Sequence, residues 1–169
     1  MVFRTTIYST LTFYDIVHSV ATIELTDEVI IEEVDQFLIE NPNCTIEELI
    51  EKSLKMTAET LVFSTASGTT DPNELRKIGR SHCVGYAAMT NSIVSYGLSK
   101  LENSGYQSNH YRGRIYVLGY EVTSLSSSPF FRDHDYVEVT NPGQGIRLRV
   151  DPSLYQFTRI GVMNIRHAK

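Results

Sequence analysis

Three side chains spread along the sequence could together form a catalytic group: Cys83, His134 and Asp151. Cys83 lies in the run RSHCVGYAAM, and apolar residues recur after it with helical spacing. A thiol at the start of a helix meets the positive end of the helix dipole and free backbone N–H groups, which both favour the thiolate. Cysteine is also among the residues most often buried, so this run alone favours a structural role for Cys83.

A nucleophilic cysteine needs a base, and the base needs a group that orients it. His134 begins the strand-like run HDYVEVT, and Asp151 follows the run IRLRV, with the turn NPGQG between the two runs. Antiparallel strands joined by a short turn bring the start of one beside the end of the other. We therefore expect His134 and Asp151 to lie side by side, although each alone is equally typical of a strand end. The chain offers four other histidines, which lack such a partner: His18, His82, His110 and His167.

Three short runs in this order resemble the core of the transglutaminase-like superfamily: CVGYA at 83–87, HDYVEV at 134–139 and VDPS at 150–153. The resemblance covers about residues 27–152. It implies a papain-like fold, with a cysteine at a helix N-terminus that faces a histidine and an aspartate on adjacent strands. It also implies that Cys83 is the nucleophile, His134 the general base and acid, and Asp151 the residue that orients His134.

The chain departs from the family beside these residues. Glycine is common in the family two residues before the cysteine, where this chain has Ser81. Tryptophan is common two residues after the histidine, where this chain has Tyr136. The segment between Cys83 and His134 is also longer than in compact members, with LSSSPFF as the inserted stretch. The three reacting groups themselves are all present.

These residues predict a cysteine-dependent acyl-transfer enzyme that acts on amide or peptide bonds. The Cys83 thiolate would attack a carbonyl of a peptide or protein substrate, and His134 would protonate the leaving amine. We favour resolution of the thioester by water, as in a cysteine peptidase or amidase; an amine acceptor would make the chain a protein-glutamine transamidase. A non-catalytic peptide-binding domain on the same fold is a further alternative. A metal site of His82, His110 and His134 is disfavoured, because these residues lack the spacing of metal ligands.

The oxyanion of such a reaction needs donors, and the backbone N–H of Cys83 is the first of them. The second donor stays open among His82, Tyr86 and Gln144. We expect the substrate groove to involve two segments rich in serine, asparagine and aromatic residues: 105–113 and 124–132.

Periodicity places these residues in an α+β fold, with helices first and a mostly antiparallel sheet after them. Thr45 with Glu48 forms a capping-box pattern, and Asp71-Pro72 is typical of a helix start. The sequence predicts a single domain over 1–169, with a helical part at about 27–104 and a β part at about 113–166. The expected helices span about 28–40, 45–63, 72–79 and 83–102, and the expected strands 114–122, 134–140, 146–150 and 159–165.

Composition restricts the partners. The net charge is −5 and the basic residues form no cluster, which argues against a nucleic-acid partner. No apolar run is long enough to span a membrane. Two cysteines are too few for a disulfide framework or a structural zinc site, and no set of acidic calcium ligands is present. We therefore predict no cofactor and no metal.

The N-terminal run MVFRTTIYSTLTFYDIVHS lacks the apolar core and the cleavage site of a signal peptide. As written, the sequence favours the cytoplasm, and a secreted protein without its leader fits it as well. The compartment and the oligomeric state therefore stay open.

Overall fold

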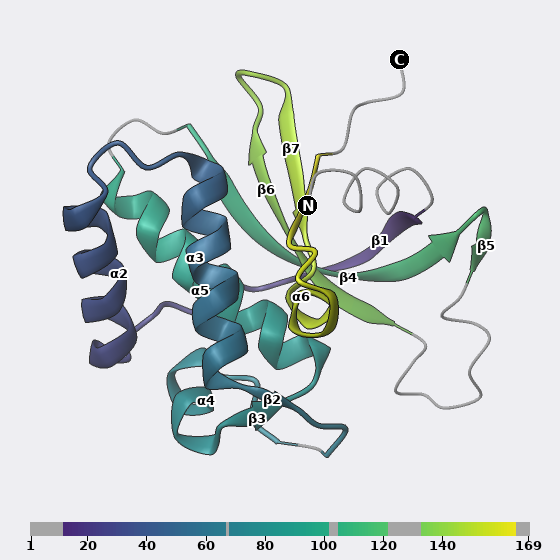
Figure 1. Ribbon diagram of the computed structural model, residues 1–169. Helices are drawn as coiled ribbons and strands as arrows, with labels where there is room; N and C mark the ends of the chain where they lie inside the picture. Colours follow the sequence, from purple (N-terminus) through teal and green to yellow (C-terminus); the bar gives the residue numbers. More distant parts are fainter. Residues whose placement is uncertain (1–11, 67, 102–104, 122–132, 165–169) are drawn as a thin grey trace.

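The chain folds into a group of helices beside an antiparallel sheet, which confirms the predicted α+β class (Figure 1). The computed structural model describes residues 12–66, 68–101, 105–121 and 133–164. The helices are α2 (Glu28–Glu40), α3 (Ile46–Thr60), α4 (Pro72–Ile78), α5 (Cys83–Lys100) and α6 (Pro152–Thr158). In Figure 1, α2 to α5 lie on one side, the sheet on the other, and α6 where they meet.

The predicted helix starts are confirmed by their caps. Thr45 and Glu48 form a capping box before α3, since each side chain bonds the other residue's backbone N–H. The Asp71 side chain accepts from Asn73 N before α4, and this helix ends at Gly79 with a φ of 70°. The sequence predicted α3 to run to about Phe63, but it ends at Thr60 because the chain then becomes extended.

Helix α5 is the central element of the helical half. Its side chains are buried on nearly all sides, because α2, α3 and α4 contact it as well as the sheet and α6. Close packing depends on Gly97, where a Cβ would lie 2.6 Å from a methyl group of Leu49. The helix starts at Cys83 as predicted and ends at Lys100, slightly before the expected end. Residues 102–104, part of the expected stop signal, lie outside the described residues.

The main sheet has the strand order β1-β4-β6-β7-β8, with β5 paired to the end of β4, and every pairing is antiparallel. A separate parallel pair, β2 and β3, lies beneath the helices. The NPGQG turn joins β6 to β7 as predicted. The strands are β1 (Thr12–Val20), β2 (Val62–Phe63), β3 (Arg80–Ser81), β4 (Gln107–Val117), β5 (Tyr120–Glu121), β6 (His134–Asn141), β7 (Ile146–Val150) and β8 (Val162–Asn164).

Two expectations about the strands were wrong. The chain is not purely helices followed by strands, because β1 precedes the helices and pairs with β4 along most of its length. The single strand expected over 114–122 is a hairpin as far as residue 121, since the chain turns at Leu118 and Gly119, which both have positive φ, and residue 122 lies outside the described residues. The strand expected at 159–165 is confirmed over the shorter range of β8, and residue 165 lies outside the described residues.

Helix α6 was also missed. The sequence predicted no helix between the strands expected at 146–150 and 159–165, but Asp151 caps a helix there with its side chain, and Pro152 is the first helical residue. The same Asp-Pro signal was correctly interpreted at Asp71. At Asp151 the same signal was missed, because a strand ends directly before this residue.

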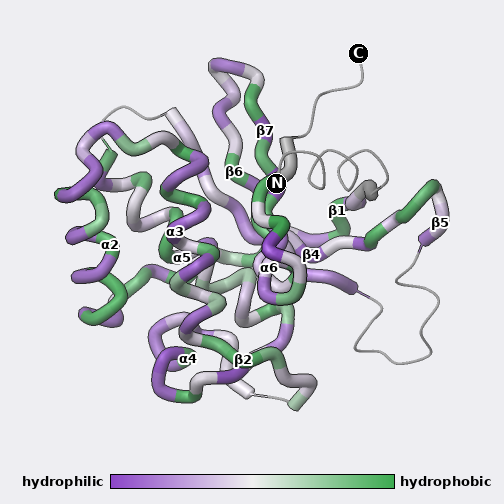
Figure 2. Tube along the Cα trace, in the orientation of Figure 1, coloured by the Kyte–Doolittle hydropathy of each residue, from purple (hydrophilic) through white to green (hydrophobic). Residues whose placement is uncertain are grey.

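Strand β6 has two different faces. Val137 and Val139 pack with β7 and with α3 and α5 in the hydrophobic core. The alternate residues of a strand point to the opposite face, which places His134, Tyr136 and Glu138 together. Along the helices that cover the core, hydrophobic and hydrophilic residues also alternate (Figure 2).

The sheet curves towards the face of His134. Strands β4 and β6 lie between β1 and β7, so β1 and β7 would be about 14 Å apart in a flat sheet. Tyr14 of β1 nevertheless hydrogen-bonds Asp151, which directly follows β7. A register shift between Ile16 and His18 marks a bulge in β1, and bulges bend strands. Side chains from distant strands therefore meet on this face.

Two further observations bear on the predictions from composition. Among the described residues, no helix combines the length and the apolar character needed to cross a membrane. Cys44 and Cys83 are both free thiols, so the chain has no disulfide between them.

Candidate active site

Cys83 is the first residue of α5, and the turn before it sets its position. The His82 ring caps the helix, since its Nδ1 accepts from the backbone N–H of Val84 at 3.3 Å. Gly85 lets the preceding strand pack against the first turn, because a Cβ there would lie 2.0 Å from the Ser81 Oγ. The Cys83 residue is 8% exposed. A nearly buried thiol thus lies at a helix N-terminus, as predicted.

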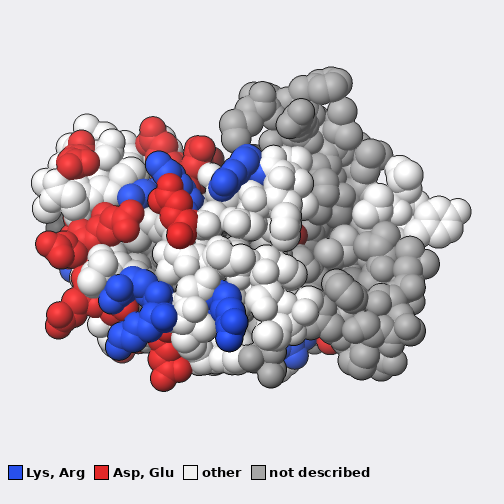
Figure 3. All heavy atoms as spheres, turned by 60° about the horizontal axis from the view of Figure 1, so that its bottom comes forward, with Lys and Arg blue, Asp and Glu red and all other residues white. Residues whose placement is uncertain are grey.

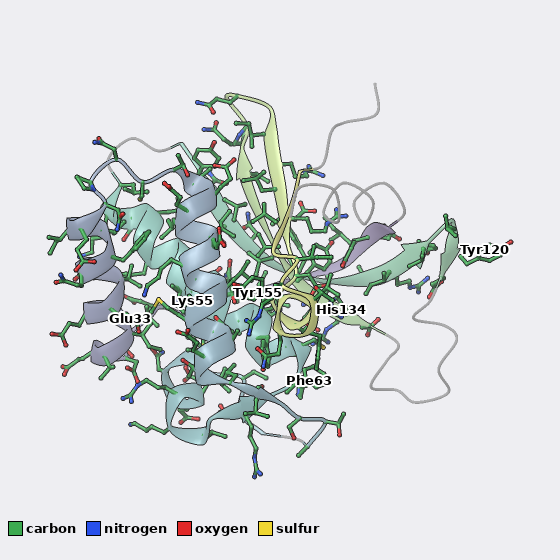
Figure 4. All side chains as sticks on the ribbon, viewed as in Figure 1. Glu33, Lys55, Phe63, Tyr120, His134 and Tyr155 are labelled. Carbon is green, nitrogen blue, oxygen red and sulfur yellow. The ribbon has the colours of Figure 1, made fainter. Side chains whose placement is uncertain are left out.

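His134 is the first residue of β6 and lies opposite Gly113 of β4. A Cβ at Gly113 would come 2.1 Å from the backbone oxygen of Asp15, so glycine lets β1 approach this point. The His134 side chain is 18% exposed, so it is largely but not fully buried. In Figure 4, His134 lies beside α6, between the helices and the strands.

Asp151 joins the sheet to α6 and has four hydrogen-bond donors. Its Oδ1 accepts from the backbone N–H of Leu154 at 2.9 Å and from the Ser153 Oγ at 3.0 Å. Its Oδ2 accepts from the Tyr14 Oη at 2.7 Å and bonds the His134 Nε2 at 2.8 Å. The side chain is 2% exposed. Asp151 is therefore a buried carboxylate that is fully bonded.

The expectation that His134 and Asp151 lie side by side is confirmed by this bond. The Cys83 side chain also interacts with the His134 ring and helps to raise the pKa of that ring. Since Asp151 holds Nε2, Nδ1 is the ring nitrogen that is left for the thiol. The structure thus brings Cys83, His134 and Asp151 together from the starts of α5 and β6 and the end of β7.

The charges of His134 and Asp151 stabilise each other. Burial of the His134 ring opposes its protonation, but the charge and hydrogen bond of Asp151, and those of Cys83, outweigh it and raise the pKa of His134 to about 10. Burial likewise opposes ionisation of Asp151, but the charge and hydrogen bond of His134, with bonds from Leu154 and Tyr14, lower the pKa of Asp151. The geometry therefore favours an imidazolium next to a carboxylate at neutral pH.

Two of the three candidates for the second oxyanion donor were wrong. The Tyr86 hydroxyl is buried and donates to the backbone oxygen of Leu61 at 2.7 Å. Gln144 lies in the β6–β7 turn, at the opposite end of these strands from His134 and Asp151. His82 is half-buried and directly precedes Cys83, so it is the candidate that the geometry leaves.

His18, His110 and Cys44 are not part of this group. His18 lies on β1, where it pairs with Arg112. His110 is buried and bonds Asp135 at 2.9 Å. His167 lies outside the described residues. Burial and the nearby Glu48 charge raise the pKa of the Cys44 thiol, against a weaker opposing effect of a backbone hydrogen bond.

Of the two segments predicted to line the substrate groove, the structure describes 105–113. Most of 105–113 is not a loop but the first half of β4, whose polar side chains find partners in the fold. Ser108 Oγ donates to Asn91 Oδ1 at 2.6 Å, and His110 bonds Asp135. The sequence missed this strand because its residues are mainly polar. Segment 124–132 lies outside the described residues.

Two residues that bond Asp151 were not found from the sequence. Tyr14 is 137 positions away, and no local pattern could pair the two residues. The aromatic and β-branched residues of 12–20 could have indicated a strand, and hence a place for Tyr14 in the sheet. Ser153 could have been found, since a serine two residues after a capping aspartate is close to its side chain.

The arrangement suits nucleophilic chemistry better than metal binding. A thiol, an imidazole and a carboxylate in a row provide a nucleophile, a proton carrier and a group that orients the carrier. Among the residues described, no group of three or more His, Cys, Asp or Glu side chains is arranged to hold a metal ion. Comparisons of the chain with protein-family models, with curated proteins and with solved structures found no match.

Proposed function

We propose that this chain is a cysteine-dependent acyl-transfer enzyme with a papain-like core of the transglutaminase-like type. The observation that carries the proposal is the His134 ring, which bonds Asp151 at 2.8 Å and interacts with the Cys83 side chain. A thiol buried for structural reasons alone has no need of this polar neighbour, which must itself be compensated by a buried carboxylate.

The reaction follows from the charges at the site. The Cys83 thiolate forms a bond to the carbonyl carbon of an amide, and the backbone N–H of Cys83 stabilises the resulting oxyanion. His134 gives its Nδ1 proton to the leaving nitrogen, so the C–N bond breaks and a thioester remains. Water then attacks the thioester while His134 takes its proton. The acid leaves, and the thiolate is restored.

The surface fits a peptide better than a polyanion. Figure 3 shows acidic and basic side chains interspersed over the helical part of one face, with a mainly uncharged area beside it. A polyanion would need a concentrated basic patch. A peptide chain can instead bind through backbone hydrogen bonds and apolar contacts.

Alkylation by iodoacetamide at pH 6.5 tests the proposal, with Cys44 as the comparator in the same molecule. We expect Cys83 to react about 100-fold faster than Cys44, because only thiolates react and the pKa of Cys44 is raised. Peptide mapping by mass spectrometry separates the two sites. Equal rates at Cys83 and Cys44 would contradict an activated nucleophile.

A screen over amide and peptide substrates then identifies the reaction, with Cys83→Ala as the control. We expect activity that is lost in Cys83→Ala and that yields the free acid. Competition between water and an added amine on a glutamine-containing peptide separates hydrolysis from transamidation. A folded protein whose Cys83 reacts rapidly, but which only binds peptides, would support the non-catalytic alternative.

A further inference from the structure

A tyrosine of β1 shares a carboxylate oxygen with His134. The Tyr14 Oη donates to Asp151 Oδ2 at 2.7 Å, and the His134 Nε2 bonds the same oxygen at 2.8 Å. Tyr14 is only 2% exposed. Building on the proposed function, we propose that Tyr14 is a positioning residue that holds Asp151 in the orientation that directs His134 towards Cys83.

The Tyr14 phenol is itself held in place. The guanidinium carbon of Arg149 lies 4.7 Å from the centre of its ring, and the Tyr136 ring meets it in a T-shaped contact with centroids 5.0 Å apart. Arg149 is fixed in turn by Glu138, whose Oε1 accepts from Arg149 Nη2 at 2.8 Å. The hydroxyl therefore presents its proton to Asp151 from a fixed position, on a strand that precedes the helices.

The Tyr14–Asp151 hydrogen bond matters because it involves the same carboxylate oxygen that His134 bonds. Leu154 and Ser153 hold Oδ1, on the side of Asp151 that caps α6. Tyr14 and His134 share Oδ2, so the phenol fixes the oxygen that orients the imidazole. Without this donor, a buried anionic oxygen keeps His134 as its one donor, and both groups gain freedom to move. The effect would reach Cys83 through the His134 ring.

Tyr136 provides a matched control from the same aromatic cluster. It is fully buried and touches the Tyr14 ring, and its hydroxyl has no hydrogen-bond partner among the described residues. Tyr14→Phe and Tyr136→Phe thus remove the same atom from neighbouring buried rings. Only the first change removes a bond to Asp151.

The experiment measures the alkylation rate of Cys83 against pH in the full chain, with Cys44→Ser to leave a single thiol. We expect Tyr14→Phe to lower the rate at pH 6.5 about tenfold, as one hydrogen bond to a charged group would. We also expect the acid limb of the profile to move to higher pH. Tyr136→Phe should stay within about twofold of the parent, because it removes no bond.

A His134→Ala background tests the route of the effect. If Tyr14 acts through His134, adding Tyr14→Phe to this background leaves the alkylation rate unchanged. An equal loss in both backgrounds would overturn the positioning role, as would identical profiles for Tyr14→Phe and Tyr136→Phe. In either case a rapid reaction of the parent's Cys83 would leave the proposed function intact. Slow alkylation in the unaltered chain would instead refute the proposed function itself.

A second measurement needs no variant, in case Tyr14→Phe does not fold. Two protons that form hydrogen bonds to the same oxygen lie close together. The Tyr14 hydroxyl proton and the His134 ring proton should therefore show a mutual nuclear Overhauser effect. Both should also exchange slowly with solvent, since the oxygen that they share is buried. Absence of this effect in a protein with both resonances assigned would overturn the shared contact.

Discussion

Two histidine–aspartate pairs meet at the start of β6, and they differ in their surroundings. His134 bonds Asp151 at 2.8 Å, and His110 bonds Asp135 at 2.9 Å, so the two bonds themselves are nearly alike. The His134 side chain is 18% exposed, whereas that of His110 is 1% exposed. A thiol faces the first ring. The second pair has instead the guanidinium of Arg112, 3.4 Å from Asp135.

The second pair has a structural explanation. Strand β4 lies inside the sheet, between β1 and β6, and carries polar residues into the fold. A buried histidine there requires a partner, and Asp135 supplies it from the neighbouring strand. His134 and Asp135 are consecutive and therefore point to opposite faces. A bonded histidine–aspartate pair thus does not indicate catalysis; the neighbouring thiol and the partial exposure of the His134 side chain distinguish the candidate site.

Replacement of His134 or His110 with alanine should have the largest effects and tests the difference between the two pairs most directly. We expect His134→Ala to lower the alkylation rate of Cys83 at pH 6.5 by about 100-fold or more, the usual range for loss of a positioned acid–base group. The variant also leaves the buried Asp151 carboxylate without its cationic partner, so we expect a lower free energy of unfolding as well, limited by the Tyr14, Ser153 and Leu154 N–H donors that Asp151 keeps. Iodoacetamide kinetics and urea unfolding measure the two effects.

His110→Ala should lower the stability without affecting the reactivity of Cys83. It leaves the buried Asp135 carboxylate without its buried partner, which costs about 3 kcal/mol of the free energy of unfolding. The alkylation rate of Cys83 should stay near that of the parent wherever the variant is folded. A folded His110→Ala protein with an unreactive Cys83 would show that the two pairs act together.

The titration of His134 sharpens the comparison. Its pKa is raised to about 10 from an ordinary value of 6.5, so the folded chain keeps a proton that the unfolded chain releases. This group's contribution to stability is complete below pH 6.5 and is lost as the pH rises through about 10. We expect the ring resonances of His134 to titrate with a midpoint near 10 in nuclear magnetic resonance spectra.

Asp151→Asn tests the cause of that midpoint. Asparagine caps a helix as well as aspartate, and its amide oxygen can still bond His134, so the change removes mainly the charge. The midpoint of His134 should fall by about one to three pH units, the usual effect of an opposite charge at this distance. An unchanged midpoint would show that Asp151 does not govern the protonation of His134.

The sequence predicted the parts of this fold that have local signals. The Thr45–Glu48 box and the Asp71-Pro72 start depend on neighbours within one turn, and the structure has both. The His134–Asp151 contact was also predictable, because a short turn joins the two strands. Local patterns fail where distant strands provide the partner. The first half of β4 was not predicted as a strand, since its polar residues are satisfied by groups on other elements such as Asp135.

The candidate site shows the same limit. The side chains with a recognisable chemistry could be named from the sequence, but Tyr14 could not, because its partner depends on the curvature of the sheet. Gln144 was one of three open candidates for the second oxyanion donor. A turn between two relevant strands suggests proximity, yet it lies at the end of the hairpin away from His134 and Asp151.

The smallest predicted effect separates the two oxygens of Asp151. Ser153→Ala removes a donor from Oδ1, and we expect a loss of about 1 kcal/mol in the free energy of unfolding. The alkylation rate of Cys83 should change by less than about threefold, because Oδ2 and not Oδ1 meets His134. Urea unfolding and iodoacetamide kinetics on the same samples measure both.

Ser92→Ala is the matched control, since Ser92 is equally buried and donates one bond, to the backbone oxygen of Ile23 at 2.6 Å. It should cost a similar stability and leave Cys83 unaffected. If Ser153→Ala slowed the alkylation as much as Tyr14→Phe, both oxygens would orient His134. The cap of α6 would then belong to the catalytic arrangement, and the two oxygens of Asp151 would no longer differ in their roles.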